Sequence, residues 1–490
     1  MLPTITVDVG TTSVKLCLFD AAGTLLASAR QATPTVADAW GEIYDVDALW
    51  AVVSGFAAGL PAGQRASTRR IAITGVGESG GLVRPDGSLA SPMILWHDHR
   101  GAEYLARLSA ADRSRIYRVT GLPVNGNYGL SKVAWAADRV TDAAGAGAAS
   151  GALDGLQWLN VSEYLAARMT GRRWSEYSLA SRTMALDLTT RGWSAEVCGL
   201  LGLPVSLFPE LRAATSGSVV TAEFAQAAGL AEDVVVHVAG HDHIVGAVGA
   251  GLAQGELLNS TGTTEGLLLL GTAPVLDEHA EASKLANGLV GDGADYALFA
   301  SIPTGGSAFQ TLQGLFGQSP DELTATVARV HERYLAGSLD PRTAPLVLPQ
   351  FRGSPPPTKN ARARGIIAGL ATDATADDIV FGCFLGLVLQ FRDVLALFRA
   401  EPVLVKVIGP AGRNPLWMQL KADLLGRPLS VSQFPEVVSR GAQALASGTV
   451  ASWADCSPEE VRPDPARTAV LAEWADGVRA QWQYLLGFPA

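Results

Sequence analysis

Short β-branched runs alternate along this chain with longer segments that carry apolar residues at helical spacing. The runs predict strands over residues 5–9, 14–19, 24–29, 71–74, 234–238 and 403–408. The helical patterns predict helices over residues 48–60, 162–169, 378–389 and 415–425. The first three strands are separated only by short Gly-containing turns, which is typical of a β-meander. We therefore expect an α/β protein whose sheets are mixed rather than purely parallel.

One strand–turn–strand pattern occurs in both halves of the sequence. DVGTTS at residues 8–13 leads into an apolar run at 14–19, and STGTTE at 260–265 leads into another at 266–270. Two units of one design, far apart in the chain, indicate a duplicated domain.

The duplication divides the chain into two parts. A length of 490 residues predicts two or three domains at about 150 residues each. We expect an N-terminal domain over 1–248 and a C-terminal domain over 249–490. The Gly- and Ala-rich segment 239–255 would connect them and act as a hinge, and the Pro-rich segment 354–357 is expected to be a surface loop.

The composition is that of an acidic globular protein. The chain has 37 Lys and Arg residues against 47 Asp and Glu, which gives a net charge of −10. Since 48% of the residues are hydrophobic and only 17% are charged, the chain is not disordered. The negative charge argues against nucleic acid or an anionic membrane as the main partner, because that binding depends on clustered Lys and Arg.

The cysteines and the apolar segments predict a cytoplasmic protein. The four cysteines are Cys17, Cys198, Cys383 and Cys456. Isolated thiols without a CxxC pair fit a reducing compartment better than a disulfide framework or a zinc site. Asp8 stands where a signal peptide would need its apolar core. The most apolar stretch, 379–389, is well short of the ~20 residues that cross a bilayer.

The two Gly-Thr-Thr turns are candidate phosphate sites. The sequence contains neither GxxxxGK[ST] nor a GxGxxG that opens a helix after a strand. Backbone N–H groups of a tight Gly-containing turn, with nearby hydroxyls, can hold phosphate instead. One such turn alone can be a plain structural hairpin, but two copies favour phosphate binding. Asp8, two residues ahead of the first turn, is placed to hold Mg2+ through water.

A second candidate is GHDH at residues 240–243, directly after a predicted strand. Asp242 at a strand end can accept a proton from a substrate hydroxyl, although it can also cap a helix. HDH occurs again at 97–99, so a metal site built from two HxH units is an alternative. No Cys or Glu ligand accompanies either unit at a familiar spacing.

A third candidate is GPAGRNPLW at residues 409–417, which follows the predicted strand 403–408. Its glycines allow a flat ligand to approach closely, Asn414 can cap or donate, and the helix from Pro415 presents its N-terminus to an anion. A plain strand-to-helix turn is the alternative interpretation.

Together these segments resemble the FGGY family of carbohydrate kinases, which includes glycerol kinase, xylulokinase and gluconokinase, and the match covers nearly the whole chain. The matching segments are DVGTTS at 8–13, WHDHR at 96–100, TGL at 120–122 with Lys132 and Trp135, EYS and ASRT within 176–183, GHD at 240–242, STGT at 260–263 and GPAGRNPLW at 409–417. The resemblance implies a two-domain, actin-like ATPase (ribonuclease H-like) fold, with mixed sheets, flanking helices and an inter-domain cleft. It also implies ATP-dependent phosphorylation of a sugar or polyol hydroxyl.

The resemblance also implies roles for individual residues. Asp242 would be the general base, and the metal Mg2+ would be held by Asp8 and Asp242. The residues expected to bind the phosphates of ATP are Thr11, Thr12, Ser13, Gly262, Thr263, Gly305 and Gly306. Those expected around the adenosine are Gly409, Gly412, Arg413 and Asn414. Those expected to bind the carbohydrate substrate are Glu78, Trp96, His97, Asp98, Asn127, Asp242 and His243.

Several positions depart from the family pattern, and because of them the resemblance does not decide which carbohydrate is the substrate. Asn127 stands where glycerol kinase has an aromatic residue, Leu385 where many members carry an acid, and Gly77 where glycerol kinase has Arg before its Glu. The carboxylates of Glu78, Asp98 and Asp242 can accept hydroxyl protons, so we expect a neutral ketose, such as a pentulose, or a polyol rather than a sugar acid. Glu78 as a helix cap is the alternative.

Two other classes of function stay open at this point. One is a metal-dependent hydrolase that uses the HxH units, and the other is a non-catalytic, actin-like nucleotide-binding protein. The presence of both Asp8 and Asp242 argues against the second. A small carbohydrate and ATP are the expected partners, and a homodimer is one open assembly.

Overall fold

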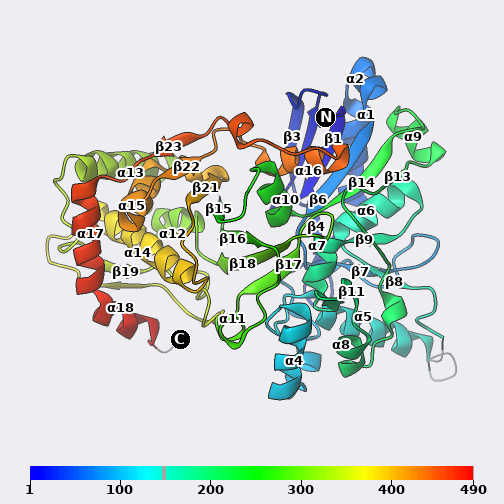
Figure 1. Ribbon diagram of the computed structural model, residues 1–490, viewed down its shortest axis with the longest axis horizontal. Helices are drawn as coiled ribbons and strands as arrows, with labels where there is room; N and C mark the ends of the chain where they lie inside the picture. Colours follow the sequence, from blue (N-terminus) through cyan, green and yellow to red (C-terminus); the bar gives the residue numbers. More distant parts are fainter. Residues whose placement is uncertain (146–150, 489–490) are drawn as a thin grey trace.

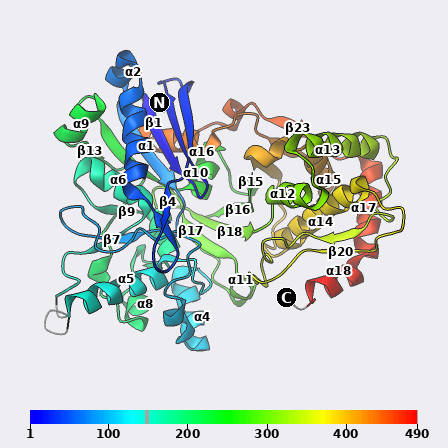
Figure 2. The ribbon, with the colours of Figure 1, turned by 180° about the vertical axis from the view of Figure 1, so that it is seen from behind.

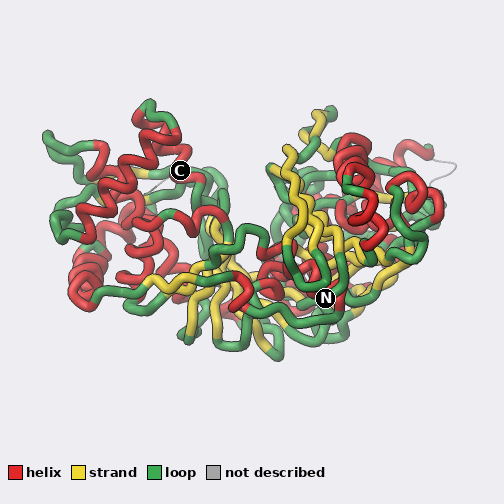
Figure 3. The backbone as a smooth tube through the Cα atoms, turned by 90° about the horizontal axis from the view of Figure 1, so that it is seen from above, coloured by secondary structure: helices red, strands yellow, loops and turns green. Residues whose placement is uncertain are grey.

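The computed structural model describes residues 1–145 and 151–488. This part of the chain forms two lobes, each built around a mixed β-sheet with helices against it (Figure 1; Figure 2 shows the opposite side). Seen from above, the lobes extend as two arms from a common base (Figure 3).

The sheet of the first lobe contains the predicted meander. Its strands, in spatial order, are β13 (Gly217–Val219), β14 (Val235–His241), β6 (Arg70–Gly75), β1 (Thr4–Val9), β2 (Ser13–Phe19) and β3 (Leu25–Ala32). β1 pairs antiparallel with β2 and parallel with β6, and β14 pairs parallel with β6. Every residue of β1 is buried, because the strand lies inside the sheet and both of its faces are covered. The strands predicted in this half are confirmed.

The sheet of the second lobe repeats this arrangement. Its strands, in spatial order, are β17 (Ala286–Leu289), β18 (Tyr296–Ile302), β16 (Glu265–Gly271), β15 (Glu256–Thr261), β21 (Leu404–Ile408), β22 (Leu429–Val431) and β23 (Glu459–Val461). β15 pairs antiparallel with β16 and parallel with β21, as β1 does with β2 and β6. The two Gly-Thr-Thr turns therefore occupy equivalent places in two sheets of one design.

Helices and small strand pairs complete both lobes. The helices of the first lobe are α1 (Val46–Gly59), α2 (Ala62–Ser67), α3 (Ala102–Ala106), α4 (Ala110–Thr120), α5 (Gly129–Ala144), α6 (Val161–Thr170), α7 (Tyr177–Ala180), the 3-10 helix η1 (Ser181–Thr183), α8 (Ala195–Leu200), α9 (Ala222–Ala228) and α10 (Asp242–Gly249). The helices that follow α10 in the chain are α11 (Glu278–Ala282), α12 (Ser307–Phe316), α13 (Pro320–Leu335), α14 (Ala376–Ala396), α15 (Pro415–Leu425), α16 (Val437–Ser447), α17 (Pro465–Gly477) and α18 (Arg479–Leu486). The remaining strand pairs are β4 (Thr35–Ala37) with β5 (Glu42–Tyr44), β7 (Gly81–Val83) with β8 (Gln157–Leu159), β9 (Trp174–Glu176) with β12 (Glu210–Arg212), β10 (Leu186–Asp187) with β11 (Gly192–Trp193), and β19 (Leu346–Leu348) with β20 (Ile366–Ala368).

Helix α14 is longer than its predicted range of 378–389. It begins at a capping box formed by Thr375 and Asp378 and runs for 21 residues. Its length and composition would allow it to cross a membrane, but 78% of its most apolar window is buried inside the protein. Leu385, at the position where many family members carry an acid, is one of these buried core residues. The helix therefore serves as a core helix of the second lobe.

Of the two segments singled out between elements, one differs from the prediction. The segment 239–255 connects β14 of the first sheet to β15 of the second, and it contains the end of β14 and the whole of α10. The segment 354–357 is a loop, but Ser354, Pro355 and Pro356 are buried, so it is not a surface excursion. Ser354 exchanges hydrogen bonds with the backbone of Asn360, and this satisfies the buried polar groups locally.

Helix α16 returns from the C-terminal half of the chain to the first lobe. Figures 1 and 2 both show it beside β1 and β6. Its Ala442 and Ala446 pack with Ala72 of β6, and Gln443 Nε2 donates to the backbone carbonyl of Asp20 over 2.8 Å. The helix crosses α10 so closely that a side chain at Gly441 would overlap the backbone of α10. The first lobe therefore includes a helix encoded after β22 of the second sheet.

Candidate active site

The first Gly-Thr-Thr turn joins β1 to β2 and is open to solvent. Gly10 N–H donates to the Ser13 carbonyl over 3.1 Å, which closes a tight turn, and the side chains of Thr11 and Thr12 are exposed. The Nε1 of Trp96 donates to Thr11 Oγ1 over 2.8 Å. The segment expected to bind carbohydrate therefore touches the turn expected to bind phosphate.

Asp8 precedes this turn and carries an oxygen without a partner. Lys15 Nζ lies 3.5 Å from its Oδ2, whereas Oδ1 is buried and accepts no hydrogen bond from the described residues. Burial raises the pKa of Asp8, the charge of Lys15 lowers it, and the charge of nearby Asp242 raises it. A free carboxylate oxygen beside a second carboxylate is the hard donor set that Mg2+ prefers. These residues therefore fit the expected ion.

Asp242 is the first residue of α10, directly after β14. Its Oδ1 accepts the His243 N–H over 2.7 Å, and a quarter of its side chain (25%) is exposed. Burial raises the pKa of Asp242 to about 7 against the lowering effect of the His243 N–H, and the charge of Glu78 raises it further. An accessible carboxylate with a pKa near neutrality can accept a proton from a substrate hydroxyl.

The backbone ahead of Asp242 is held from both sides. Ser178 Oγ accepts the His241 N–H over 2.9 Å, and Thr74 Oγ1 donates to the Gly240 carbonyl over 2.7 Å. Gly240 has a φ of +121°, and a side chain there would overlap Ser178. The chain therefore reaches Asp242 along a fixed path.

Glu176 supports Ser178 from a buried position and gives a pH-dependent prediction. It accepts hydrogen bonds from the Ser178 N–H and hydroxyl, and burial raises its pKa from 4.5 to about 8. The folded protein therefore holds this proton more tightly than the unfolded chain, so the associated stability is lost as the pH rises from 4.5 through about 8.

We expect Glu176→Gln, which has no proton to lose, to gain stability relative to the wild type across that range, by about 2–4 kcal/mol above its upper end. The two proteins should respond alike below the lower end. Urea unfolding across the pH range checks this, with Glu223→Gln on the exposed first turn of α9 as the control. A stability difference that does not change with pH would show that Glu176 titrates as in an unfolded chain.

His241 and His243 flank Asp242. Among the described residues, these three are the only group of at least three candidate ligands, and their ligand atoms lie within 4.8 Å of one another. Burial lowers the pKa of both histidines, that of His243 to about 4, so both are neutral at physiological pH. His243 Nδ1 lies 3.1 Å from Ser260 Oγ of the second lobe. The pair is thus part of the boundary between the lobes.

The second HxH unit does not join this cluster. His97 is exposed, and His99 Nε2 lies 2.6 Å from Asn127 Oδ1. Asp98 is already engaged, because its Oδ1 accepts the Arg100 N–H and its Oδ2 accepts two bonds from the Arg100 guanidinium over 2.9 and 2.6 Å. The loop is held by its own ion pair, and Asp98 is less free for a substrate than the sequence indicates.

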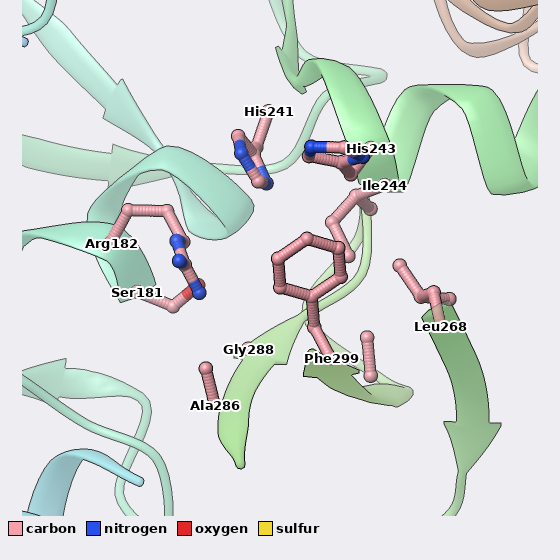
Figure 4. Close-up of a pocket in the computed structure, with 10 residues that line it drawn as sticks. Ser181, Arg182, His241, His243, Ile244, Leu268, Ala286, Gly288 and Phe299 are labelled. Carbon is pink, nitrogen blue, oxygen red and sulfur yellow. The ribbon is translucent and has the colours of Figure 1, made fainter. Parts of the chain in front are cut away.

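Glu78 is paired with Arg182, which the sequence reasoning did not name as a site residue. Arg182 Nε and Nη2 both donate to Glu78 Oε1, over 2.9 and 2.6 Å. Arg182 also borders a small cavity whose other walls come from both lobes (Figure 4). The residues around this cavity are Ser181, Arg182, His241, His243, Ile244, Leu268, Ala286, Gly288, Ala297 and Phe299.

Two lysines near the site were also missed as functional candidates. Lys15 lies between Asp8 and Glu436, 3.5 and 3.9 Å away. Lys132 is fully buried, donates to the Asn127 carbonyl over 2.6 Å, and has a pKa that burial lowers to about 7. Asp8 lies seven residues from Lys15 and Asn127 five residues from Lys132, so only Glu436 comes from a distant segment.

A cavity of about 520 Å³ lies in the second lobe beside the second Gly-Thr-Thr turn. Among the predicted cofactor residues, those that border it are Gly262, Thr263, Gly305, Gly306, Arg413 and Asn414. Phe309, Phe384 and Trp417 add apolar walls. The size and the mixed lining fit a nucleoside with its phosphates directed to the turn.

The backbone of residues 305 and 306 closes one end of this cavity. Gly305 N–H donates to the Thr263 carbonyl over 3.1 Å and Gly306 N–H to the Gly262 carbonyl over 2.8 Å. A Cβ at Gly306 would lie 2.6 Å from the Gly262 oxygen, so the turn would have to move.

We expect Gly306→Ala to raise the KM for ATP about 10-fold or more, because a displacement near 1 Å is enough to disturb a bound group. Initial rates at varied ATP concentration measure it. Gly314→Ala, in α12 where an added Cβ meets no atom within 4 Å, is the matched control. An unchanged KM for ATP in Gly306→Ala would place the phosphates elsewhere.

The predicted adenosine segment follows β21 and begins α15. Asn414 caps this helix through the Trp417 N–H, over 3.0 Å. Gly409 has a φ of +99°, and a side chain there would overlap the backbone of Thr261. Gly412 is buried and does not border the cavity. These two glycines therefore shape the turn, whereas Arg413 and Asn414 face the cavity.

Comparisons with known proteins agree with this geometry. The model of the "FGGY family of carbohydrate kinases, N-terminal domain" matches residues 4–249, and that of the corresponding C-terminal domain matches 257–449. A glycerol kinase from Nocardia farcinica is 28% identical over 507 aligned positions that cover 97% of this chain and 98% of that protein.

Solved structures show the same fold over nearly the whole chain. A xylulose kinase from Lactobacillus acidophilus has a TM-score of 0.85 at 19% identity and covers 99% of both chains. A Plasmodium falciparum glycerol kinase solved with ADP has a TM-score of 0.80 at 18% identity and covers 99% of this chain and 98% of that one. The expected two-domain, actin-like ATPase fold is confirmed. The chain belongs to the FGGY family of carbohydrate kinases and is an enzyme that phosphorylates a sugar or polyol with ATP.

Proposed function

We propose that this kinase transfers the γ-phosphate of ATP to a hydroxyl of a neutral ketose or polyol, with Asp242 as the general base. The observation that carries the proposal is the position of Asp242. Its accessible carboxylate stands at a strand end beside Asp8 and the first Gly-Thr-Thr turn. The paired state of Glu78 and Asp98 leaves Asp242 as the carboxylate best placed to take a proton.

In the proposed reaction the substrate hydroxyl loses its proton to Asp242 as its oxygen bonds to the γ-phosphorus. The bond from that phosphorus to the bridging oxygen breaks, and ADP leaves with the electron pair. The turn at 262–263 and the loop at 305–306 hold the phosphates, and Arg413 and Asn414 contact the nucleoside. Because the reaction needs positioned groups and little covalent chemistry from the protein, the fixed backbone at Gly240 and His241 supports it.

Asp8 and Asp242 are the residues that would hold Mg2+, which supplies neutralisation of phosphate charge when bound. The unpartnered Oδ1 of Asp8 is the observation that favours this. Lys15 beside Asp8 limits the repulsion between the two carboxylates.

We also propose a cytoplasmic location, supported by four free cysteines that are all buried. A hydrolase built on the HxH units lacks support, because only His241, Asp242 and His243 come together among the described residues.

A substrate panel tests the proposal directly. Purified enzyme, ATP and Mg2+ are incubated with glycerol, pentuloses, hexuloses, pentitols and aldonates, and ADP release is followed. Turnover of neutral ketoses or polyols is the expected result, and turnover of an aldonate alone would overturn the choice of substrate class.

A further inference from the structure

Gly77 leaves room beside Glu78 that the side chain of Arg182 fills. A Cβ at Gly77 would lie 2.6 Å from Arg182 Cγ and 2.8 Å from His241 Cδ2, both closer than a real Cβ tolerates. Arg182 comes from η1, 105 positions farther along the chain, yet its stem packs on the backbone of Gly77. The absence of a side chain at position 77 is thus what allows the arginine to occupy this place.

Arg182 is held there by more than its ion pair. Its side chain is only 7% exposed, and its guanidinium carbon lies 5.1 Å from the ring centre of Tyr128 and 5.9 Å from that of Phe299. Tyr128 belongs to the first lobe and Phe299 to β18 of the second. Figure 4 shows the arginine side chain between η1 and the strand that carries Gly288. A cation in such a stacked, desolvated setting is fixed in orientation.

The pair leaves polar groups on both partners available to a ligand. Glu78 uses only Oε1 for Arg182, and its Oε2 accepts no hydrogen bond from the described residues while 12% of the side chain stays exposed. Glu78 takes two of the five guanidinium N–H groups. The pair therefore offers one acceptor and further donors side by side, with no net charge.

We propose that Arg182 and Glu78 together form the specificity-determining subsite for a vicinal diol of the substrate, a site that only Gly77 permits. One hydroxyl donates to Glu78 Oε2 and its neighbour accepts from the Arg182 guanidinium, and this matches the donor and acceptor present in each hydroxyl. The substrate class is a neutral polyhydroxy compound, since a carboxylate in this position would meet Glu78. The inference rests on the proposed function, because it concerns the carbohydrate that Asp242 deprotonates.

The test measures KM for carbohydrate and for ATP separately. We expect Arg182→Met to raise the KM for the best neutral substrate of the panel about 10- to 100-fold, as the loss of a hydrogen bond from a charged donor does. The KM for ATP should stay within about twofold. Arg182→Lys keeps the positive charge but not the paired N–H groups of the guanidinium, so its carbohydrate KM should lie between those of the wild type and Arg182→Met. A deoxy analogue of the substrate lacks one hydroxyl of the diol. The ratio of kcat/KM for the substrate to kcat/KM for this analogue should be smaller in Arg182→Met than in the wild type.

Gly77→Ala provides an independent arm. We expect it to raise the carbohydrate KM about 10-fold in the wild-type background and to have a smaller effect in Arg182→Ala, because the closest contact, with Arg182 Cγ, is then gone and the contact with His241 Cδ2 remains. Gly217→Ala controls for general destabilisation. Gly217 lies in β13 at the edge of the first-lobe sheet, and an added Cβ there would lie 2.5 Å from Val235 Cγ1. Thermal unfolding of each variant shows whether the fold survives.

The outcomes separate the two proposals. Wild-type enzyme that phosphorylates no carbohydrate of the panel would defeat the proposed function. An active wild type whose Arg182→Met variant folds and keeps the carbohydrate KM would overturn the subsite alone. Additive effects of Gly77→Ala and Arg182→Ala, or tighter selection for an aldonate than for any polyol, would also overturn it.

Discussion

Replacing Asp242 with Asn is expected to lower kcat about 10²- to 10⁴-fold while ATP still binds. The amide has the shape of the carboxylate, and its oxygen can still accept the hydrogen bond from the His243 N–H. In the wild type this hydrogen bond to Asp242 Oδ1 is 2.7 Å long. The loop should therefore keep its course, held by Ser178 and Thr74. What is lost is the group that takes the substrate proton.

A coupled assay of ADP release measures kcat, and calorimetric titration measures ATP affinity. Asp45→Asn is a control for the loss of a carboxylate at a helix start, because Asp45 caps α1 through the Ala48 N–H over 3.0 Å. Full kcat in Asp242→Asn would refute the base assignment. Loss of ATP binding along with the rate would mean that Asp242 acts mainly at the phosphates.

Replacing Lys421 with Met should lower the free energy of unfolding by about 3–5 kcal/mol. Lys421 and Glu265 form an ion pair whose side chains are both 0% exposed, and Lys421 also donates to Asn259 Oδ1 over 2.7 Å. Its ammonium lies 4.2 Å from the ring centre of Phe391 and 4.8 Å from that of Trp417. Met fills similar space but leaves the Glu265 carboxylate buried without a counter-charge.

Urea unfolding of the Lys421 variant measures the loss. Changing Glu265 to Gln in the same chain should restore much of the stability, because no charge is then stranded. Arg462→Met, which breaks an ion pair whose side chains are 79% and 48% exposed, should change stability by less than about 1 kcal/mol. A similarly small effect in Lys421→Met would mean that water reaches the pair.

Local patterns predicted most strands of the first sheet, but in the second sheet only β21 and the strand–turn–strand unit of β15 and β16. The turns at 10–12 and 262–264 were visible because each is a continuous stretch between two apolar runs. The predicted end of α14 at residue 389 was wrong, because the charged residues Arg392 and Asp393 made the sequence look like the end of a helix. In the fold, Asp393 accepts hydrogen bonds from Arg479 and Trp482 of α18, partners nearly 90 residues later. A helix boundary decided by such contacts is invisible to a local pattern.

The residues expected to bind the carbohydrate were even harder to judge from local sequence patterns. The three carboxylates of Glu78, Asp98 and Asp242 look equivalent in the sequence, yet two of them are bonded to arginines. Arg100 stands two positions from Asp98, and its role still depends on how the loop folds. Arg182 is 104 positions from Glu78, so only the folded chain brings this pair together.

The late position of α16 in the sequence affects how the protein is made. During synthesis the strands of the first sheet are complete once residue 241 has left the ribosome, but Ala442 and Ala446 follow only after β22 of the second sheet. At ~5–20 residues per second, the apolar face around Ala72 stays uncovered for on the order of tens of seconds. The nascent first lobe is therefore a natural client for chaperones, and its final packing waits for nearly the whole chain.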